Sequence, residues 1–285
     1  MKKILITGRN SFIGNSLEAW LSKYPTDYAI DKISFRNDDW KLKDFSWYDA
    51  IVHVAGIAHV SNDENLKANY YKVNRDLTIA LAKKAKVDGV KQFIFMSSII
   101  IYGASEIQNG MITRETVPKA KDFYGDSKIQ AEAGLNKLES PNFRIAIIRP
   151  PMIYGKGSKG NYPKLAKLAV KVPFFPNFDN KRSMIHVDNL SEFIRLLILH
   201  EEAGVYFPQN EAYVQTSQLV KTIVQAHGKQ NYQTKLFNPL IRLFMSFNMI
   251  NKVFGDYAYE QVLSEYENGN YKVYNLKQSI DLTEK

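Results

Sequence analysis

Short apolar runs alternate with segments of helical spacing through the first half of the chain. The runs typical of buried strands are 3–7, 31–35, 50–56, 92–98 and 142–148. Between them, apolar residues recur every three or four positions, as in an amphipathic helix, at 17–21, 65–87 and 126–138. Strands that alternate with helices are joined by right-handed crossovers into a parallel sheet. The pattern therefore predicts an α/β fold with a doubly wound parallel sheet.

The second half of the chain has a looser pattern after Pro151. The elements that we expect there are a Gly-rich loop at 154–161, a helix at 163–172, a strand at 182–187, a helix capped by Asp188-Asn189 and running to His200, a strand at 205–207 and a helix at 216–226. These shorter elements predict a smaller region attached to the main sheet.

The apolar stretch 239–254 is predicted to be one helix, interrupted by Arg242 and Asn248. It is compatible with a lid, a dimer surface or a helix that lies on a membrane surface, and a packed terminal helix is the commonest explanation. No uninterrupted apolar run approaches membrane-spanning length, so we expect no integral membrane segment.

Charge and cysteine content narrow the chemistry. The net charge is +9, but Lys and Arg are scattered among acids without a basic block, so nucleic acid is not an expected partner. A basic chain also suits small polyanions such as dinucleotides and nucleotide-sugars. There is no cysteine, and the five His show no ligand spacing, so we expect no metal site. Absent cysteine and the lack of a cleavage site after Met1-Lys2-Lys3 fit a cytoplasmic protein.

A glycine-containing turn follows the first strand and precedes a helix, which is the context of a dinucleotide-binding loop. Its residues are Gly8-Arg9-Asn10-Ser11-Phe12-Ile13-Gly14. Gly8 would permit the tight turn, and Gly14 would let the helix pack closely on the strand. Ser11 stands where a middle Gly is usual, and its hydroxyl could donate to the pyrophosphate. The alternative is an ordinary turn capped by Asn10 or Ser11.

The end of the second strand indicates which dinucleotide is bound. An NAD site usually has an acid there for the ribose 2′-hydroxyl. Here Arg36 occupies the position, and its guanidinium, with Arg9, would suit a 2′-phosphate. This favours NADP(H) over NAD(H), and the alternative is a solvated Arg36 with Asp38 at the ribose.

Small and polar residues end the next strands, where open α/β sheets bind ligands. Val54-Ala55-Gly56 would let a cofactor lie over one strand end, and the fourth strand delivers Ser97 and Ser98 to the same edge. Asn74 stands inside the helix expected at 65–87, where an amide costs stability unless it is hydrogen-bonded. His53 is expected to be a packing residue and not a catalyst.

Tyr124 and Lys128 are the candidate acid–base pair. A helix that begins just after Tyr124 brings both side chains to one face, because they are four positions apart. A nearby ammonium favours the phenolate and lowers the pKa of the phenol from its usual value of ~10. Such a pair can exchange a proton with a sugar hydroxyl or ketone. A solvated helix face is the alternative explanation of the spacing.

Taken together and in this order, the motifs resemble those of the extended short-chain dehydrogenase/reductase superfamily, and within it the NAD-dependent epimerase/dehydratase family. The resemblance covers about residues 3–210. The motifs that carry it are Thr7-Gly8…Gly14, Asp49-x-Ile-Val-His53-x-Ala55, Asn74, Ser97-Ser98…Tyr102-Gly103, Tyr124-x-x-x-Lys128, Arg149-Pro150 and Arg182-x-x-Ile-His-Val187.

The resemblance implies a Rossmann domain over 1–150, completed by about 183–203, and a substrate-binding region formed by 151–182 and 204–285. It assigns acid–base catalysis to Tyr124, ribose binding to Lys128 and the reacting oxygen to Ser98. It further implies that Asn74 supports the active-site region and that Pro150 belongs to the cofactor site. It places the substrate diphosphate at Asn161 and Arg182. Paired helices forming a homodimer are usual in this family.

The same resemblance limits the reaction. Nucleotide-sugar 4,6-dehydratases place Asp-Glu after the active-site hydroxyl, whereas Ile99-Ile100 follow Ser98 here, so elimination of water is disfavoured. The chain looks most like the capsule and O-antigen enzymes that reduce UDP-2-acetamido-2,6-dideoxy-4-hexulose to UDP-N-acetylfucosamine or UDP-N-acetylquinovosamine. A UDP-sugar 4-epimerase needs the same Ser, Tyr and Lys and is the first alternative. The second alternative is a non-catalytic NAD(P)-sensing regulator.

Overall fold

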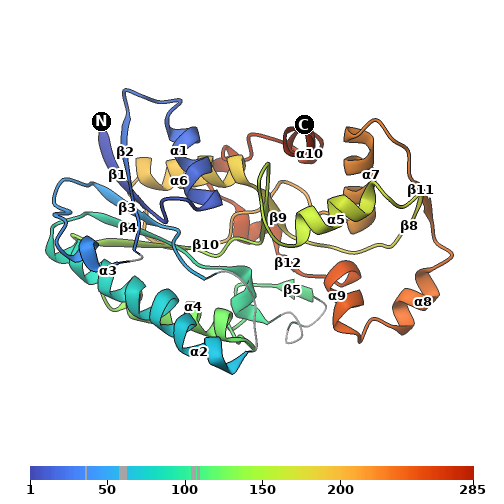
Figure 1. Cartoon of the computed structure of the whole chain (residues 1–285), viewed down its shortest axis with the longest axis horizontal. Coiled ribbons are helices and arrows are strands. Elements are labelled where there is room, and N and C mark those ends of the chain that lie inside the picture. Colours follow the sequence, from blue (N-terminus) through green and yellow to red (C-terminus); the bar gives the residue numbers. More distant parts are fainter. Residues whose placement is uncertain (36, 58–62, 104–106, 108–109) are drawn as a thin grey trace.

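A six-stranded parallel sheet forms the centre of the larger part of the molecule (Figure 1). The computed structural model describes residues 1–35, 37–57, 63–103, 107 and 110–285. The strand order is β2-β1-β3-β4-β6-β10, and all neighbours run parallel. The bounds are β1 (Lys2–Thr7), β2 (Tyr28–Ile33), β3 (Ala50–His53), β4 (Gln92–Met96), β6 (Arg144–Ile148) and β10 (Gly204–Tyr206). The predicted α/β fold with a parallel sheet is confirmed.

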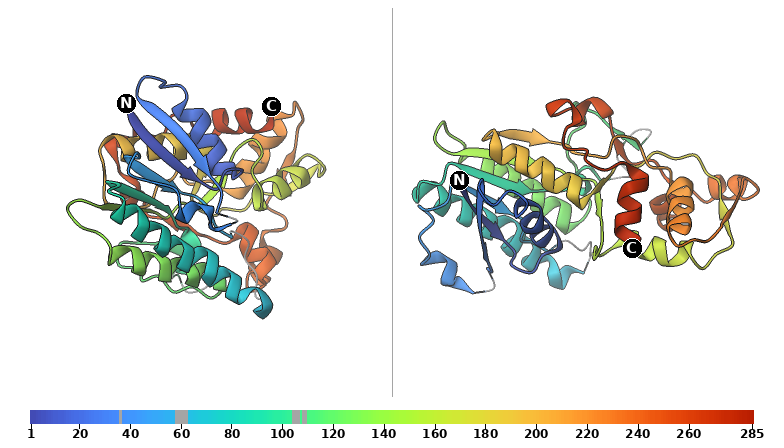
Figure 2. Two further views of the ribbon diagram at one scale, coloured as in Figure 1. Left: turned by 60° about the vertical axis from the view of Figure 1, so that its left-hand side comes forward. Right: turned by 90° about the horizontal axis from the view of Figure 1, so that it is seen from above.

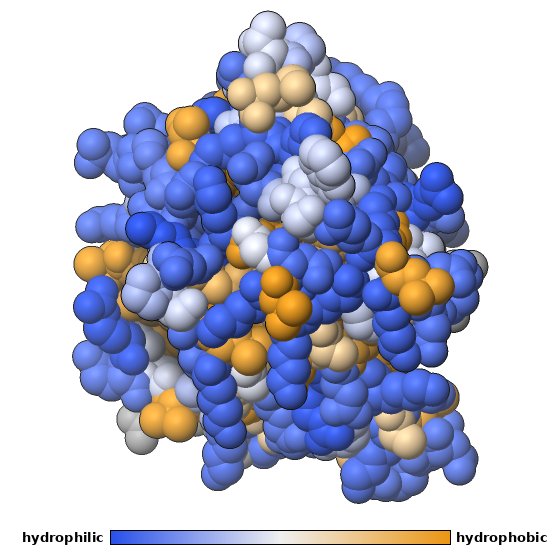
Figure 3. Space-filling view, turned by 90° about the vertical axis from the view of Figure 1, so that its left-hand side faces the viewer, coloured by the Kyte–Doolittle hydropathy of each residue, from blue (hydrophilic) through white to orange (hydrophobic). Residues whose placement is uncertain are grey.

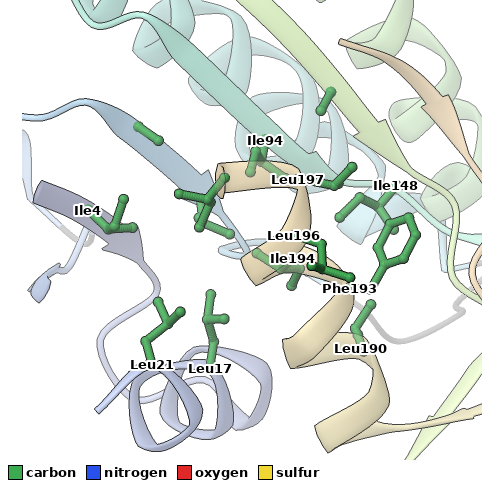
Figure 4. Close-up of a cluster of buried hydrophobic side chains, with 14 of the residues drawn as sticks. Ile4, Leu17, Leu21, Ile94, Ile148, Leu190, Phe193, Ile194, Leu196 and Leu197 are labelled. Carbon is green, nitrogen blue, oxygen red and sulfur yellow. The ribbon is translucent and has the colours of Figure 1, made fainter. Parts of the chain in front are cut away.

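Helices cover both faces of this sheet because its strands alternate apolar side chains between two cores. Ile4, Ile94 and Ile148 point to one face, where α1 (Phe12–Leu21) and α6 (Val187–Leu199) pack, as Figure 4 shows. Leu5 and its counterparts in β3, β4 and β6 point to the other face, against α3 (Leu77–Val87) and α4 (Phe123–Asn136).

Several predicted boundaries differ from the structure. The second strand begins at Tyr28 and not at 31, because β2 is an edge strand whose half-exposed side chains lack a continuous apolar run. Helix α6 is capped by His186, whose Nδ1 accepts from the backbone N–H of Asp188 (3.3 Å), and not by Asp188-Asn189. β10 extends the main sheet beyond residue 203, where we expected the Rossmann part to end; the remaining domain division stays a prediction.

The helix expected at 65–87 is continuous but contains a change of helix type. It consists of α2 (Glu64–Tyr70), a π-helical turn (Tyr71–Asp76) and α3. π-Turns are rare and often occur at functional sites. This one carries the buried Asn74.

The second half of the chain builds the other end of the molecule. Its elements are β7 (Met152–Tyr154), α5 (Asn161–Ala169), β8 (Phe174–Pro176), β9 (Met184–His186), α7 (Thr216–Ala226), β11 (Tyr232–Thr234), α8 (Asn238–Leu243), α9 (Asn248–Phe254), β12 (Ala258–Tyr259) and α10 (Leu276–Glu284). β7 pairs with β9, β8 with β11, and β12 with β5 (Met111–Ile112). We call residues 151–178 and 212–255 the distal lobe, which lies at the end away from the N-terminus (Figure 2).

The apolar stretch 239–254 is two short helices, so the prediction of one helix was wrong. The chain turns between α8 and α9, where Phe247 is extended (φ −76°, ψ 126°). This break allows Ile241 and Phe254 to enter the same buried cluster of the distal lobe. Among the helices that the structure describes, none has the length and apolar character needed to cross a bilayer.

Candidate active site

The turn between β1 and α1 forms a tight phosphate-sized cradle. Gly8 has a positive φ of 79°, and a Cβ on Gly14 would lie 2.7 Å from Ser11 Oγ. Ser11, and not Asn10, caps α1, because its Oγ accepts from the backbone N–H of Gly14 (3.0 Å). The Ser11 proton is not used in this bond and can be donated to an anion. The first turn of α1 has no acid, so these residues fit a dinucleotide pyrophosphate.

A series of buried side-chain hydrogen bonds fixes the ends of β1 and β3 beside this turn. Thr78 must donate to the Asn74 carbonyl (2.8 Å), so its oxygen accepts from His53 Nε2 (2.9 Å). His53 Nδ1 therefore accepts from the hydroxyl of Thr7 (2.9 Å). Thr7 Oγ1 in turn accepts from the N–H groups of Val54 and Ala55 (3.1 and 3.2 Å). Burial, with a smaller effect of Lys128, lowers the pKa of His53 to about 3, so this ring is neutral and structural.

Asn74 connects the end of β3 to helix α4. Its Oδ1 accepts from the N–H of Ile57 (2.8 Å), and its Nδ2 donates to the Ile57 carbonyl (3.1 Å) and to Ser127 Oγ (3.1 Å). A Cβ on Gly56 would lie 3.0 Å from Asn74 Oδ1 and 3.5 Å from Lys128 Nζ. Gly56 therefore lets the amide and the ammonium approach the strand end closely.

Ser98 and Tyr124 are brought together by two elements that are distant in sequence. The backbone on either side of Ser98 is held by β6 and its continuation, because Ser97 N–H donates to Ile148 O (2.7 Å) and Ile99 N–H to Pro150 O (2.9 Å). The Ser98 hydroxyl lies close enough to the Tyr124 phenol to lower its pKa. Both side chains are only partly buried, so a substrate can reach them.

Helix α4 begins earlier than predicted, and Tyr124 lies inside its first turn. Asp122 is the N-cap, and its Oδ1 accepts from the N–H of Gly125 (2.8 Å). Gly125 permits close packing, because a Cβ there would lie 2.7 Å from the Cβ of Ala120 and 3.2 Å from the carbonyl oxygen of Ile100. This contact sets the position of Tyr124 against the segment that carries Ser98.

Lys128 lies one turn after Tyr124 and is buried. Its Nζ donates to Met96 O (2.8 Å) and lies 4.5 Å from the centre of the Phe95 ring. Burial lowers the pKa of Lys128 to about 7, partly offset by Glu132. The ammonium thus faces the end of β4 beside Gly56, where it can donate to a ribose.

The pKa of Tyr124 differs from the expected direction. The pKa is raised to about 12: burial raises it most, Ser98 lowers it, and Asp122 and Tyr70 raise it. We had expected Lys128 to lower this pKa. In the structure, loss of hydration at the phenol is the larger effect, and the ammonium of Lys128 is directed to Met96.

The acids close to the catalytic helix already have partners. Glu132 accepts from Ser97 Oγ (2.5 Å) and from Arg149 Nη2 (2.6 Å), while Arg149 Nη1 donates to the Tyr102 hydroxyl (2.7 Å). Asp122 is occupied by the helix cap. Neither carboxylate is therefore available to protonate a leaving hydroxyl.

Arg182 reaches the opposite side of the site together with a tyrosine that the sequence did not indicate. Its Nη1 donates to Gly255 O (2.9 Å). The Tyr257 hydroxyl donates to Ile99 O (2.7 Å), next to Ser98. The pKa of Tyr257 is raised, chiefly by burial. The charge of Arg182 opposes this shift, and the charge of Asp122 adds to it. No spacing motif marks Tyr257, because it stands 159 residues from Ser98 in an irregular segment.

The described part of the structure does not link the remaining predicted residues, Asn161 and Arg36, to the site. Asn161 is exposed at the start of α5, and no hydrogen bond in the described chain joins it to Arg182. Arg36 lies outside the described residues. Among the acids on either side of it in the sequence, Asp31 accepts from the Tyr48 hydroxyl (2.6 Å), and Asp38 pairs with Lys41 (2.9 Å). Asp39 accepts from Asn37.

The parallel sheet, the tight glycine turn and the placement of Ser98, Tyr124 and Lys128 are those of the extended short-chain dehydrogenase/reductase superfamily. The pattern of the NAD dependent epimerase/dehydratase family matches residues 4–214, and the chain belongs to this family. It is therefore an NAD(P)-dependent enzyme, as the sequence resemblance implied.

Three known proteins illustrate the similarity. A UDP-glucose 4-epimerase of Vibrio cholerae is 31% identical over 278 residues, which cover 89% of this chain and 83% of that protein. A GDP-6-deoxy-D-mannose reductase of Pseudomonas aeruginosa is 26% identical over 225 residues, 72% of this chain and 73% of the relative. The solved structure of RMD from Pseudomonas aeruginosa with NADPH has a TM-score of 0.72 at 19% identity, covering 99% of this chain and 98% of that one.

The buried Lys128 gives a prediction for stability against pH. An unfolded Lys titrates near ~10.4, whereas the folded protein holds this pKa at about 7. Between these values the unfolded state binds more protons, so the free energy of unfolding rises with pH, by at most about 1.4 kcal/mol per pH unit. Lys128→Met removes this contribution. In urea unfolding at pH 7, 8 and 9, the free energy of unfolding of wild type should increase relative to that of the variant as the pH rises.

Lys83→Met is the matched control, because Lys83 is exposed on the neighbouring helix α3. Its stability should run parallel to wild type over the same pH range. Parallel curves for Lys128→Met as well would show that Lys128 has an ordinary pKa in the folded protein.

Proposed function

We propose that this enzyme transfers hydride at C4 of a nucleotide-sugar. Most specifically, it reduces a UDP-2-acetamido-2,6-dideoxy-4-hexulose to UDP-N-acetylfucosamine or UDP-N-acetylquinovosamine in the cytoplasm, for surface polysaccharide synthesis. The observation that carries this proposal is that α4 places Tyr124 and the buried Lys128 one turn apart, with Ser98 beside Tyr124. The similarity to a UDP-sugar epimerase and a GDP-deoxysugar reductase supports the substrate class.

The bound nicotinamide cofactor would supply or accept the hydride. The cradle from Gly8 to Gly14 would hold its pyrophosphate, and Val54 to Gly56 would border it at the strand ends. Lys128 would donate to the ribose from its position beside Gly56. Tyr124 would give the proton to sugar O4, while Ser98 orients that oxygen by donating a second hydrogen bond.

The protonation state of Tyr124 favours reduction. With a pKa of about 12, the phenol carries its proton at neutral pH, which is the form that protonates an oxygen as a ketone is reduced. Glu132 and Asp122, two acids described beside α4, already accept hydrogen bonds, which weighs against a role of either in elimination of water. Arg182 and Tyr257 would bind the nucleotide-sugar on the opposite side.

We further propose a preference for NADP(H) over NAD(H). The acids described near the end of β2 are engaged with Tyr48, Lys41 and Asn37, so none is free to bind the two ribose hydroxyls of NAD. Arg36 would then contact the 2′-phosphate. A homodimer, usual in this family, remains part of the proposal.

A UDP-sugar 4-epimerase is the second candidate, and the 31% identity with the Vibrio cholerae epimerase favours it. An epimerase first removes the proton from sugar O4 and later returns a proton to that oxygen. Tyr124 would therefore need to be a phenolate before the reaction begins. A cofactor-sensing regulator is a third candidate from another class. The retention of Tyr124, Lys128 and Ser98 in one site weighs against it.

Tyr124→Phe should reduce turnover by about 10²–10⁴-fold, because it removes the proton donor. Tyr71→Phe is the control, since the Tyr71 hydroxyl contacts Asp126 on the same helix but outside the site (2.6 Å). Circular dichroism and cofactor titration should show that both variants fold and bind NADPH. Turnover of Tyr124→Phe at the wild-type rate would remove the catalytic role of this residue.

Product analysis separates the candidate reactions. Incubation of a UDP-4-hexulose with NADPH should yield a C4 alcohol by NMR, with one NADPH oxidised per product. Interconversion of two UDP-hexoses without added cofactor would instead identify the epimerase. Cofactor binding without any hydride exchange across a panel of nucleotide-sugars would identify the regulator.

Arg36→Ala should raise the KM for NADPH by about tenfold or more and leave the KM for NADH nearly unchanged, because only NADPH carries the 2′-phosphate. Arg9→Ala tests the second guanidinium in the same way. Equal effects of Arg36→Ala on both cofactors would argue that Arg36 does not read the 2′-phosphate.

A further inference from the structure

Two segments that are separate in sequence concentrate positive charge in the distal lobe. Residues 151–178 and 212–255 contain ten Lys and Arg and no Asp or Glu. The other 28 Lys and Arg of the chain are balanced by its 29 Asp and Glu. The scattering of charges that we noted along the sequence therefore does not hold here. The ten basic residues are Lys156, Lys159, Lys164, Lys167, Lys171, Lys221, Lys229, Lys235, Arg242 and Lys252.

The fold places these residues on one lobe, where Lys156 and Lys229 donate to the backbone carbonyls of Lys285 and Val170 (3.1 and 3.4 Å). β8 pairs with β11, and α5 packs with α7, so the two segments are interleaved. All ten side chains belong to exposed residues, and none is ion-paired within the described part of the chain. The neighbouring α10 supplies acids, but Glu284 is bound to Tyr162 and His227, and Asp281 to Lys277 and Lys285.

The same lobe carries an exposed apolar ridge over α8 and α9. We define this ridge as Leu236, Leu240, Leu243, Phe244, Phe247 and Met249. Within α8, Leu240 and Leu243 are three residues apart and share one side, while Ile241 is buried, as is Phe254 of α9. Leu243, Phe247 and Met249 are 72%, 60% and 80% exposed.

The ridge is unlike the opposite end of the molecule. There, hydrophobic side chains are scattered among hydrophilic ones, as Figure 3 shows. Scattered apolar residues are normal on a soluble surface, whereas a contiguous group marks an interaction site. Figure 1 shows α8 and α9 at the outer edge of the distal lobe.

We propose that the distal lobe docks on an anionic lipid membrane through the apolar ridge and the surrounding cations. Apolar side chains at the interface and Lys or Arg facing anionic headgroups are the two contributions that hold a peripheral protein on such a surface. The two segments themselves contain no acid, so the ten cations outnumber Asp179, Glu211 and Asp256, which border the segments. Aliphatic Leu and Met dominate the exposed ridge, which favours lipid over the stacked bases of a nucleic acid.

Docking would also bring the membrane close to the candidate substrate site. The carbonyl of Gly255, at the end of α9, accepts from Arg182 Nη1 (2.9 Å) and from Asn180 Nδ2 (3.4 Å). The C-cap residue of α9, the helix that carries Met249 of the ridge, is therefore in contact with Arg182, which we propose to bind the substrate. This inference does not depend on which nucleotide-sugar reaction the enzyme performs.

Vesicle sedimentation of the full-length protein tests the proposal. Binding to phosphatidylcholine vesicles that contain phosphatidylglycerol should be about tenfold or more tighter than to phosphatidylcholine alone. It should weaken strongly in high salt, because screening shortens the range of the charges. Equal binding to both vesicles, or none to either, would overturn the proposal.

Matched variants identify the surface. Leu243→Ser combined with Phe247→Ser should abolish most of the binding, whereas Leu42→Ser with Val87→Ser, which are exposed in the other half of the molecule, should not. Sedimentation of the two pairs alike would overturn the assignment to the ridge. Turnover of a soluble substrate should be unchanged in all of these variants.

The charge contribution has its own control. Lys235→Glu, Arg242→Glu and Lys252→Glu together should remove the preference for anionic vesicles. The same change of charge at Lys83, Lys91 and Lys137, which are exposed elsewhere, should leave it intact. Size-exclusion chromatography tests the alternative, in which a second copy of the chain covers the ridge. In that case the wild-type protein would be a dimer that does not bind vesicles, and the Leu243→Ser, Phe247→Ser variant would be a monomer.

Discussion

The close approach of helix α4 to the segment after β4 is the contact on which the site depends. Gly125 leaves no room for a side chain between α4 and the carbonyl of Ile100, and Asp122 fixes the start of the helix two residues before Tyr124. The phenol of Tyr124 is therefore held at a defined position beside Ser98. One helical turn later, Lys128 reaches the end of β4 through the same packing.

A chain of buried hydrogen bonds supports this contact from below. Thr7, His53, Thr78 and Asn74 each use their hydrogen-bonding groups in one consistent direction, which fixes the neutral tautomer of His53. A buried polar group left without its partner costs about 1–3 kcal/mol, so the members of such a network hold one another in place. The π-turn is the backbone form that carries Asn74 into this network.

Burial also governs the charges of the site. It raises the pKa of Tyr124 to about 12 and lowers that of Lys128 to about 7, so both groups are shifted towards their neutral forms. The carboxylate of Glu132 is compensated by Arg149 and Ser97. The candidate site thus lies beside a distal lobe whose Lys and Arg have no acidic partner in the described chain, and the two meet where Arg182 contacts the end of α9.

The sequence by itself determined the parallel sheet, the tight turn between β1 and α1 and the family, because apolar strand runs, the spacing of Gly8 and Gly14 and the Tyr124–Lys128 pair are local patterns. Only the tertiary structure decided the rest. The break between α8 and α9, the π-turn, the placement of Tyr257 near Ser98 and the direction of the Tyr124 pKa all depend on contacts between residues far apart in the chain. Desolvation and packing arise from neighbours in space, and the order of residues does not reveal them.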